Sequence, residues 1–353
     1  MVSRAAAEGP LRMNLIVALF GVLNASFSAQ SGQVDLDRMP PEVRSRIKLL
    51  PQLVQARLST WLLPPSPLRR GPPYGEFPFD SCRGKAEHHH TWTTSSTAVP
   101  LVVGCGRSGT HALAAALTGH GITATHEKYS LGSPAVSWRA TGLAYASRYW
   151  GVGVCWYAPL MVLHRGPLQT IASLARGFNG RGACSGRAAE AADRFSWDYA
   201  ARFVQIPPLE QLRGGVHENG SLCKMPRTFR LELALHYYVK WTALSDALTS
   251  LSFRLEDMTL DSFVDPWCAF CDALNQTQHV SLQDGGRSEM RYHCQCPRHQ
   301  RGQLRNVSVV PTGQEVARGS TLPRGGVDWA ELHAIDRELT AAAKALATMH
   351  GYD

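Results

Sequence analysis

One glycine-rich turn in this chain has the residue types of an anion-binding loop. The apolar, β-branched run 99–103 is typical of a buried strand, and the Ala/Leu segment 112–117 is typical of a helix. Between them stand Gly104, Gly106 and Gly109. Glycines let the backbone come close to a ligand, and the unpaired amides at a helix start point toward negative charge. The turn therefore predicts a site for a phosphate-like group.

Two common nucleotide-binding patterns share these glycines. Gly104 and Gly109 have the spacing of the G-x-x-x-x-G-K-[ST] loop, but Thr110 occupies the lysine position, so ATP hydrolysis is not expected. Gly104, Gly106 and Gly109 also match the G-x-G-x-x-G dinucleotide pattern, and the acidic Glu127 follows about 20 positions later. Spacing alone therefore leaves a nicotinamide-dependent oxidoreductase open.

The run Arg107-Ser108-Gly109-Thr110 resembles the 5′-phosphosulfate loop of sulfotransferases that use 3′-phosphoadenosine-5′-phosphosulfate (PAPS). In that family a basic residue, then Ser or Gly, Gly and Thr wrap the sulfate-bearing phosphate. The resemblance implies that Arg107 stabilises the charge that builds on the bridging oxygen as the sulfuryl group leaves. The residues implied at this end of the nucleotide are Gly106, Arg107, Ser108, Gly109, Thr110 and His111.

A second segment resembles the part of the same family that holds the 3′-phosphate. Residues 160–165 are predicted as a buried strand, and Pro167 suits the start of the helix that follows, where its missing N–H costs nothing. In the family, a strand-end arginine and a serine eight residues later hold the 3′-phosphate. The resemblance implies these roles for Arg165 and Ser173.

Two further segments match the family in order along the chain. The run 253–258 is similar to its Arg-Tyr-Glu-Asp-Leu strand end, where we expect Arg254 and Glu256 to serve in a structural ion pair. Asp328 begins a capping box for one last helix that runs almost to the end of the chain. The family's basic loop before that helix folds over the nucleotide, which makes Arg318 or Arg324 a candidate contact.

Sulfuryl transfer to a hydroxyl or amine needs a group that takes the acceptor's proton. Cytosolic members of the family use histidine, and several luminal branches use glutamate near the end of the second strand, predicted here at 122–125. The resemblance therefore implies Glu127 as the base and His126 as the alternative. A purely structural Glu127 also stays open, and in a dinucleotide site this residue would hold a ribose.

The matches span residues 99–353 and imply an α/β, three-layer, P-loop-like fold with a central parallel β-sheet. We assign residues 98–353 to the catalytic domain, in which 227–249 is predicted as a helix with an apolar face and no chemistry. The Pro- and Gly-rich residues 30–97 are predicted as a stem. Residues 1–29, with arginines before an apolar run, are predicted as a signal peptide or a type II membrane anchor.

Either N-terminal interpretation delivers the rest of the chain to the secretory lumen. Nine cysteines then predict disulfides with at least one thiol left over. Cys268-x₂-Cys271 and Cys294-x-Cys296 also resemble a zinc knuckle, but a luminal setting favours disulfides. Cys105 is expected to be a small packing residue. Glycosylation acceptors are predicted at Asn219, Asn275 and Asn306.

The net charge of +8 suits a polyanionic nucleotide, but basic and aromatic residues are not clustered together, so nucleic-acid binding is not expected. The sequence as a whole predicts a sulfotransferase of the secretory lumen, either membrane-anchored in the Golgi or secreted. It would move a sulfuryl group from PAPS to a hydroxyl or amine of a glycan or secreted-protein acceptor, without a metal ion. The alternatives are an NAD(P)-dependent oxidoreductase and a non-catalytic luminal glycan-binding protein on the same fold.

Overall fold

The computed structural model describes about half of the chain, all of it between residues 96 and 352. The described residues are 96–97, 99–127, 133–142, 144, 157–177, 187–206, 225–248, 251–283, 292–294, 296–297 and 326–352. The predicted signal or anchor segment, nearly all of the predicted stem, Asn219, Asn306 and the predicted nucleotide contacts Arg318 and Arg324 lie outside these residues.

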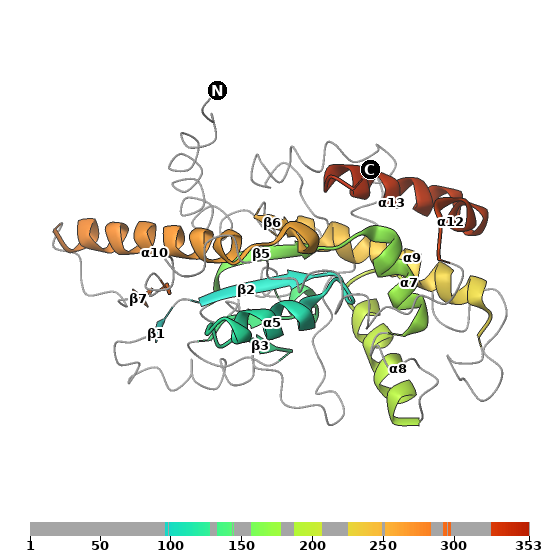
Figure 1. Ribbon diagram of the computed structural model, residues 1–353, viewed down its shortest axis with the longest axis horizontal. Helices are drawn as coiled ribbons and strands as arrows, with labels where there is room; N and C mark the ends of the chain where they lie inside the picture. Colours follow the sequence, from blue (N-terminus) through green and yellow to red (C-terminus); the bar gives the residue numbers. More distant parts are fainter. Residues whose placement is uncertain are drawn as a thin grey trace, which may run out of the picture.

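A parallel five-stranded sheet forms the centre of the domain (Figure 1). Its spatial order is β3-β4-β2-β5-β6, and each neighbouring pair is parallel. The central strand shows the register: Val102 pairs with Val136 on one side and with Met161 on the other. The strands are β2 (Val99–Gly104), β3 (Thr125–His126), β4 (Ala135–Val136), β5 (Tyr157–His164) and β6 (Ser252–Arg254).

Alternate residues of β2 point into two separate cores, one on each face of the sheet. Leu101 and Val103 belong to the first core, whereas Val102 belongs to the second. This is why the strand is apolar at every position rather than at every other one. Two cores around one parallel sheet confirm the predicted three-layer α/β fold.

Helices on both faces complete the layers. The first core is covered by α7 (Pro167–Arg176), α8 (Arg187–Ala201), α9 (Arg227–Asp246), α12 (Trp329–Ile335) and α13 (Arg337–Met349). The second core is covered by α5 (Thr110–Gly119) and α10 (Leu260–Gln283). None of the described helices is both long and apolar enough to cross a bilayer.

Helix α9 is the central helix of the first core, and it packs against α7, α12 and α13. Its predicted apolar face is buried, as expected, but Val239, Lys240 and Ala243 on other faces are buried too. A helix surrounded in this way must be apolar or hydrogen-bonded all round. The assignment of this helix to the core was correct, but two of its side chains also hold the glycine-rich loop, as described below.

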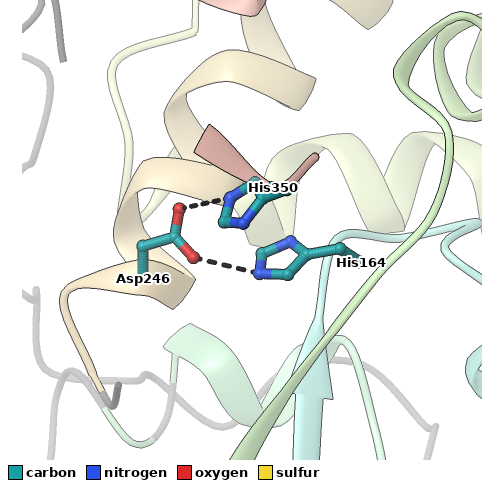
Figure 2. A group of neighbouring side chains, drawn as sticks. All are labelled: His164, Asp246 and His350. Carbon is teal, nitrogen blue, oxygen red and sulfur yellow. Dashed lines mark hydrogen bonds and ion pairs between the residues drawn. The ribbon is translucent and has the colours of Figure 1, made fainter. Parts of the chain in front are cut away.

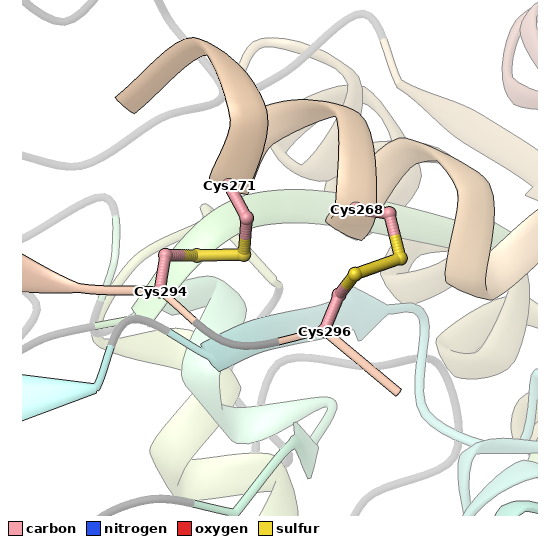
Figure 3. Close-up of a disulfide and its surroundings, with 4 residues drawn as sticks. All are labelled: Cys268, Cys271, Cys294 and Cys296. Carbon is pink, nitrogen blue, oxygen red and sulfur yellow. A yellow bond between two sulfur atoms is a disulfide. The ribbon is translucent and has the colours of Figure 1, made fainter. Parts of the chain in front are cut away.

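Two disulfides join the middle of α10 to the segment around β7 (Tyr292–His293), as Figure 3 shows. Cys268 bonds Cys296, and Cys271 bonds Cys294, so the pairs are nested. The four thiols are therefore bonded to one another rather than shared by a zinc ion. Persistent disulfides indicate an oxidising environment, which is found in the secretory lumen or outside the cell.

Two elements differ from the sequence prediction. The strand expected at 122–125 is formed only by Thr125 and His126. The single last helix is two helices, because the backbone of Asp336 is extended between them and its side chain accepts from the Leu339 amide at 2.9 Å. The predicted start is correct, since the Asp328 carboxylate accepts from the Glu331 amide at 2.8 Å.

Candidate functional site

The glycine-rich loop and the end of β5 meet at the carboxyl edge of the sheet. Arg107 Nε donates a 3.0 Å hydrogen bond to Ser173 Oγ on α7, although 66 residues separate them in sequence. Arg165, directly after β5, directs its Nη1 to the carbonyl oxygen of Arg107 at 3.4 Å. The two predicted phosphate-binding segments therefore form one continuous site, because β2 and β5 are neighbouring parallel strands.

The loop has a backbone shape that depends on its glycines. Arg107 and Gly109 have φ values of 69° and 98°, in the left-handed region. A Cβ atom on Gly109 would lie 2.3 Å from Leu255 Cδ2, and one on Gly104 would lie 2.6 Å from the Leu163 carbonyl oxygen. Gly104 is therefore required by its close approach to the backbone of β5, and Gly109 is required mainly by its left-handed conformation.

Side chains from α9 hold the loop from its buried side. Tyr237 Oη accepts from the Gly106 amide at 3.0 Å, and Trp241 Nε1 donates to the Gly104 carbonyl oxygen at 3.1 Å. The two rings stack, with centroids 5.4 Å apart. Thr141 Oγ1 also donates to the Gly104 carbonyl oxygen at 3.2 Å. Sequence reasoning missed these contacts because the helical spacing of Tyr237 and Trp241 signals only burial.

Two hydroxyls of the loop differ in what they contact. Ser108 is 1% exposed, and its Oγ has no hydrogen-bond partner among the described residues. Thr110 Oγ1 lies 3.1 Å from His126 Nε2. His111, at the same helix start, makes an edge-to-face contact with the His126 ring at 5.0 Å between centroids. A buried hydroxyl without a partner costs free energy, and an anionic oxygen in the loop would relieve that cost.

The site concentrates positive charge. Burial lowers the pKa of Arg107, and the guanidinium groups of Arg165 and Arg176 lower it further. Burial likewise lowers the pKa of Arg165, which Glu256 partly offsets. Arginine stays protonated despite such shifts. Three neighbouring cations in a partly buried site are therefore suited to a dianionic ligand.

Glu127 lies at the end of β3, next to the loop, with a left-handed φ of 53°. Its Oε2 accepts from Ser137 Oγ at 2.6 Å, and its Oε1 accepts from the Trp138 amide at 3.0 Å. Burial raises the pKa of this carboxyl, although the Ser137 hydrogen bond opposes the shift. A carboxylate with a raised pKa is a stronger base than an exposed one.

His126 is the neighbouring candidate base, and 28% of its side chain is exposed. Burial lowers its pKa to about 4, and the positive charges of nearby His111 and Arg139 add to that effect. The imidazole is therefore neutral at any pH above that value. Its Nε2 lies 3.6 Å from Glu127 Oε1 as well as near Thr110. The two predicted bases form a connected pair at one side of the loop.

No family model, curated protein or solved structure matches this chain. The site's chemistry must therefore be judged from its own residues.

The expected ion-pair use of Arg254 and Glu256 is only partly correct. Arg254 Nε pairs with Asp257 Oδ2 at 3.1 Å, not with Glu256. Glu256 instead faces the site: its Oε1 accepts from the Gly166 amide at 3.0 Å, and its Oε2 accepts from Tyr352 Oη at 2.7 Å. A 3₁₀ turn at Leu255–Asp257 ends the strand and redirects the Glu256 side chain, which strand alternation could not foresee.

The predicted binding and catalytic residues lie close together in the structure. Arg107 joins the two segments, because its side chain donates to Ser173 and its carbonyl oxygen lies 3.4 Å from Arg165 Nη1. His126 contacts Thr110 at the start of α5 and lies next to Glu127. Each of these described candidates therefore lies at the same sheet edge, where ligands of open parallel sheets bind.

Proposed function

We propose that this protein is a PAPS-dependent sulfotransferase of the secretory pathway, acting in the Golgi on a hydroxyl or amine of a glycan or secreted protein. The 3.0 Å contact between Arg107 and Ser173 is the observation that carries the proposal. It joins a loop suited to a 5′-phosphosulfate to a segment suited to a 3′-phosphate. A nucleotide with phosphates on both its 5′ and 3′ positions is the ligand that such a pair of positions fits.

In the proposed reaction the acceptor oxygen or nitrogen attacks the sulfur of PAPS, and the bond between sulfur and the bridging phosphate oxygen breaks. Arg107 stabilises the charge that develops on that oxygen, together with amides at the start of α5. Arg165 and Ser173 hold the 3′-phosphate. Glu127 takes the acceptor's proton, with His126 as the alternative. Adenosine 3′,5′-bisphosphate leaves as the second product.

The strand order disfavours the oxidoreductase alternative. In the dinucleotide-binding fold, the strand after the first helix pairs directly with the first strand. Here β3 follows α5 but pairs with β4, and β4 lies between it and β2.

A thermal-shift titration tests the ligand class. Adenosine 3′,5′-bisphosphate, ATP, NAD and NADP are added in parallel to the full chain, and transfer of labelled sulfate from PAPS is then measured with a panel of glycan acceptors. We expect the bisphosphate to raise the melting temperature at the lowest concentration. A larger shift with NAD or NADP would refute the proposal. Poor binding of all four nucleotides, with no transfer to any acceptor, would favour the glycan-binding alternative.

A further inference from the structure

We propose that His164, Asp246 and His350 form a binding site for one Zn²⁺ ion. The three residues come from distant parts of the chain and meet near the carboxyl edge of the sheet (Figure 2). His164 is the last residue of β5, Asp246 is the last residue of α9, and His350 caps α13. The proposed ion takes no part in the proposed sulfuryl transfer, so this proposal does not rest on the proposed function.

The ligand atoms already face one another. His164 Nε2 lies 3.1 Å from Asp246 Oδ1, and His350 Nε2 lies 2.9 Å from Asp246 Oδ2. One ligand atom from each of the three residues lies within 4.8 Å of the other two. Zinc bonds of about 2.0–2.1 Å place two tetrahedral ligand atoms about 3.3 Å apart. The observed nitrogen–oxygen distances are close to that separation.

The histidine rings stack, with centroids 3.5 Å apart and planes at 23° (Figure 2). An ion bound between their Nε2 atoms and the carboxylate would require the rings to turn slightly apart about their side-chain torsions. It would also replace the imidazole protons that face the carboxylate, so each ring would carry its proton on Nδ1. Zinc binding therefore displaces the imidazole protons that face the carboxylate, and the ion takes their place.

Burial makes the cluster unlike a chance surface grouping. The side chains of His164, Asp246 and His350 are 7%, 5% and 5% exposed. Burial alone would raise the pKa of Asp246, but the two histidines hold it below its usual range. Two imidazoles and one carboxylate are a donor set that zinc accepts, leaving a fourth position for water. Zinc also has no redox chemistry, which suits an oxidising environment.

A cavity of about 420 Å³ reaches the cluster and supplies the route for an ion and its water. Both histidines line it. The charge of Arg254, which also lines it, is offset by Asp257 at 3.1 Å. Asp257 itself lines the cavity, and the other lining residues are Ser252, Phe253, Met258, Ser262 and Met349.

The test uses the full chain, stripped of metal, with His88, His89 and His90 changed to Gln because that run could bind zinc independently. Zinc affinity is measured by competition with a chromophoric chelator, and Co²⁺ is added separately to record its visible absorption. Three variants remove one ligand each: His164→Gln, Asp246→Asn and His350→Gln. His333→Gln, an exposed histidine on α12, is the matched control.

We expect one zinc ion per chain, a rise in melting temperature on zinc addition, and the absorption of tetrahedral Co²⁺. Loss of an outer-shell partner costs about 10- to 100-fold in metal affinity, so loss of a direct ligand should cost ~100-fold or more. His333→Gln should bind like its parent. Absence of tight zinc binding in the parent, or binding that survives all three substitutions, would overturn the proposal. The parent measurement decides even if a variant fails to fold.

Discussion

Replacing Arg165 with alanine should weaken binding of adenosine 3′,5′-bisphosphate far more than binding of adenosine 5′-monophosphate. Arg165 is half-buried at the end of β5, and its hydrogen bond to the Arg107 carbonyl oxygen is long at 3.4 Å. Its guanidinium therefore contributes little to holding the loop. Its removal should chiefly affect a ligand group that it contacts directly.

The size of the difference follows from the chemistry of that contact. A hydrogen bond to a charged group contributes about 1.5–3 kcal/mol, so loss of the 3′-phosphate contact should cost about 2–3 kcal/mol, or roughly 30- to 150-fold in Kd. The lost charge also acts on the 5′-phosphate through solvent. At about 10 Å in water that effect is ~0.4 kcal/mol, or roughly twofold. The monophosphate should therefore lose only about a factor of two.

Isothermal titration calorimetry at one fixed ionic strength measures both affinities. Arg337→Ala is the matched control, because Arg337 is an exposed arginine at the opposite end of α13 from His350 and its loss changes the net charge equally. It should alter both affinities by a similar small factor. Equal losses of bisphosphate and monophosphate binding in Arg165→Ala would refute the assignment of Arg165 to the 3′-phosphate.

Three other predictions test the loop, the base and the core. Gly109→Ala should destabilise the fold by about 2 kcal/mol, measured by urea unfolding, because Gly109 has a φ of 98° and its new Cβ would lie 2.3 Å from Leu255. Gly119→Ala should be neutral, because the space around Gly119 is open. Glu127→Gln should lower kcat by about 10²- to 10⁴-fold and leave bisphosphate affinity unchanged; retained activity would make His126 the base. In the parent, activity should fall as pH drops through the raised Glu127 pKa. Burial, and then the charge of Lys240, lower the His236 pKa to about 4, so the unfolded state binds more protons between pH 6.5 and 4. The free energy of unfolding should therefore fall by up to about 3 kcal/mol as the pH is lowered from 6.5 to 4, and His236→Gln should reduce that fall. A free energy of unfolding that depends on pH in the same way in the variant would contradict the burial argument.

The sequence alone was sufficient to predict the strands and helices that are long and have a strong pattern of apolar residues. The run 99–103 is apolar at every position because both faces of β2 are covered, and its glycine-rich continuation is visible without a structure. The eight-residue spacing of Arg165 and Ser173 was likewise visible. The structure adds that Ser173 contacts Arg107 directly, a pairing across 66 residues that no local pattern encodes.

Other features depend on contacts that sequence periodicity does not report. Asp336 interrupts the last helix because its carboxylate caps the next one, and a good helix-forming sequence on both sides hides that break. Glu256 reaches Gly166 and Tyr352 because a 3₁₀ turn redirects it. Asp246 appears as one polar residue on a buried helix, and only the fold brings two histidines to it.

The hydrogen bonds beneath the glycine-rich loop have a consequence for the thermodynamics of ligand capture. The loop backbone at Gly104 and Gly106 is tied to Tyr237, Trp241 and Thr141 within the protein itself. Its conformational entropy is therefore lost when the chain folds and is not lost again when an anion arrives. Recognition at this loop should resemble lock-and-key docking, with fast association and little rearrangement of the backbone.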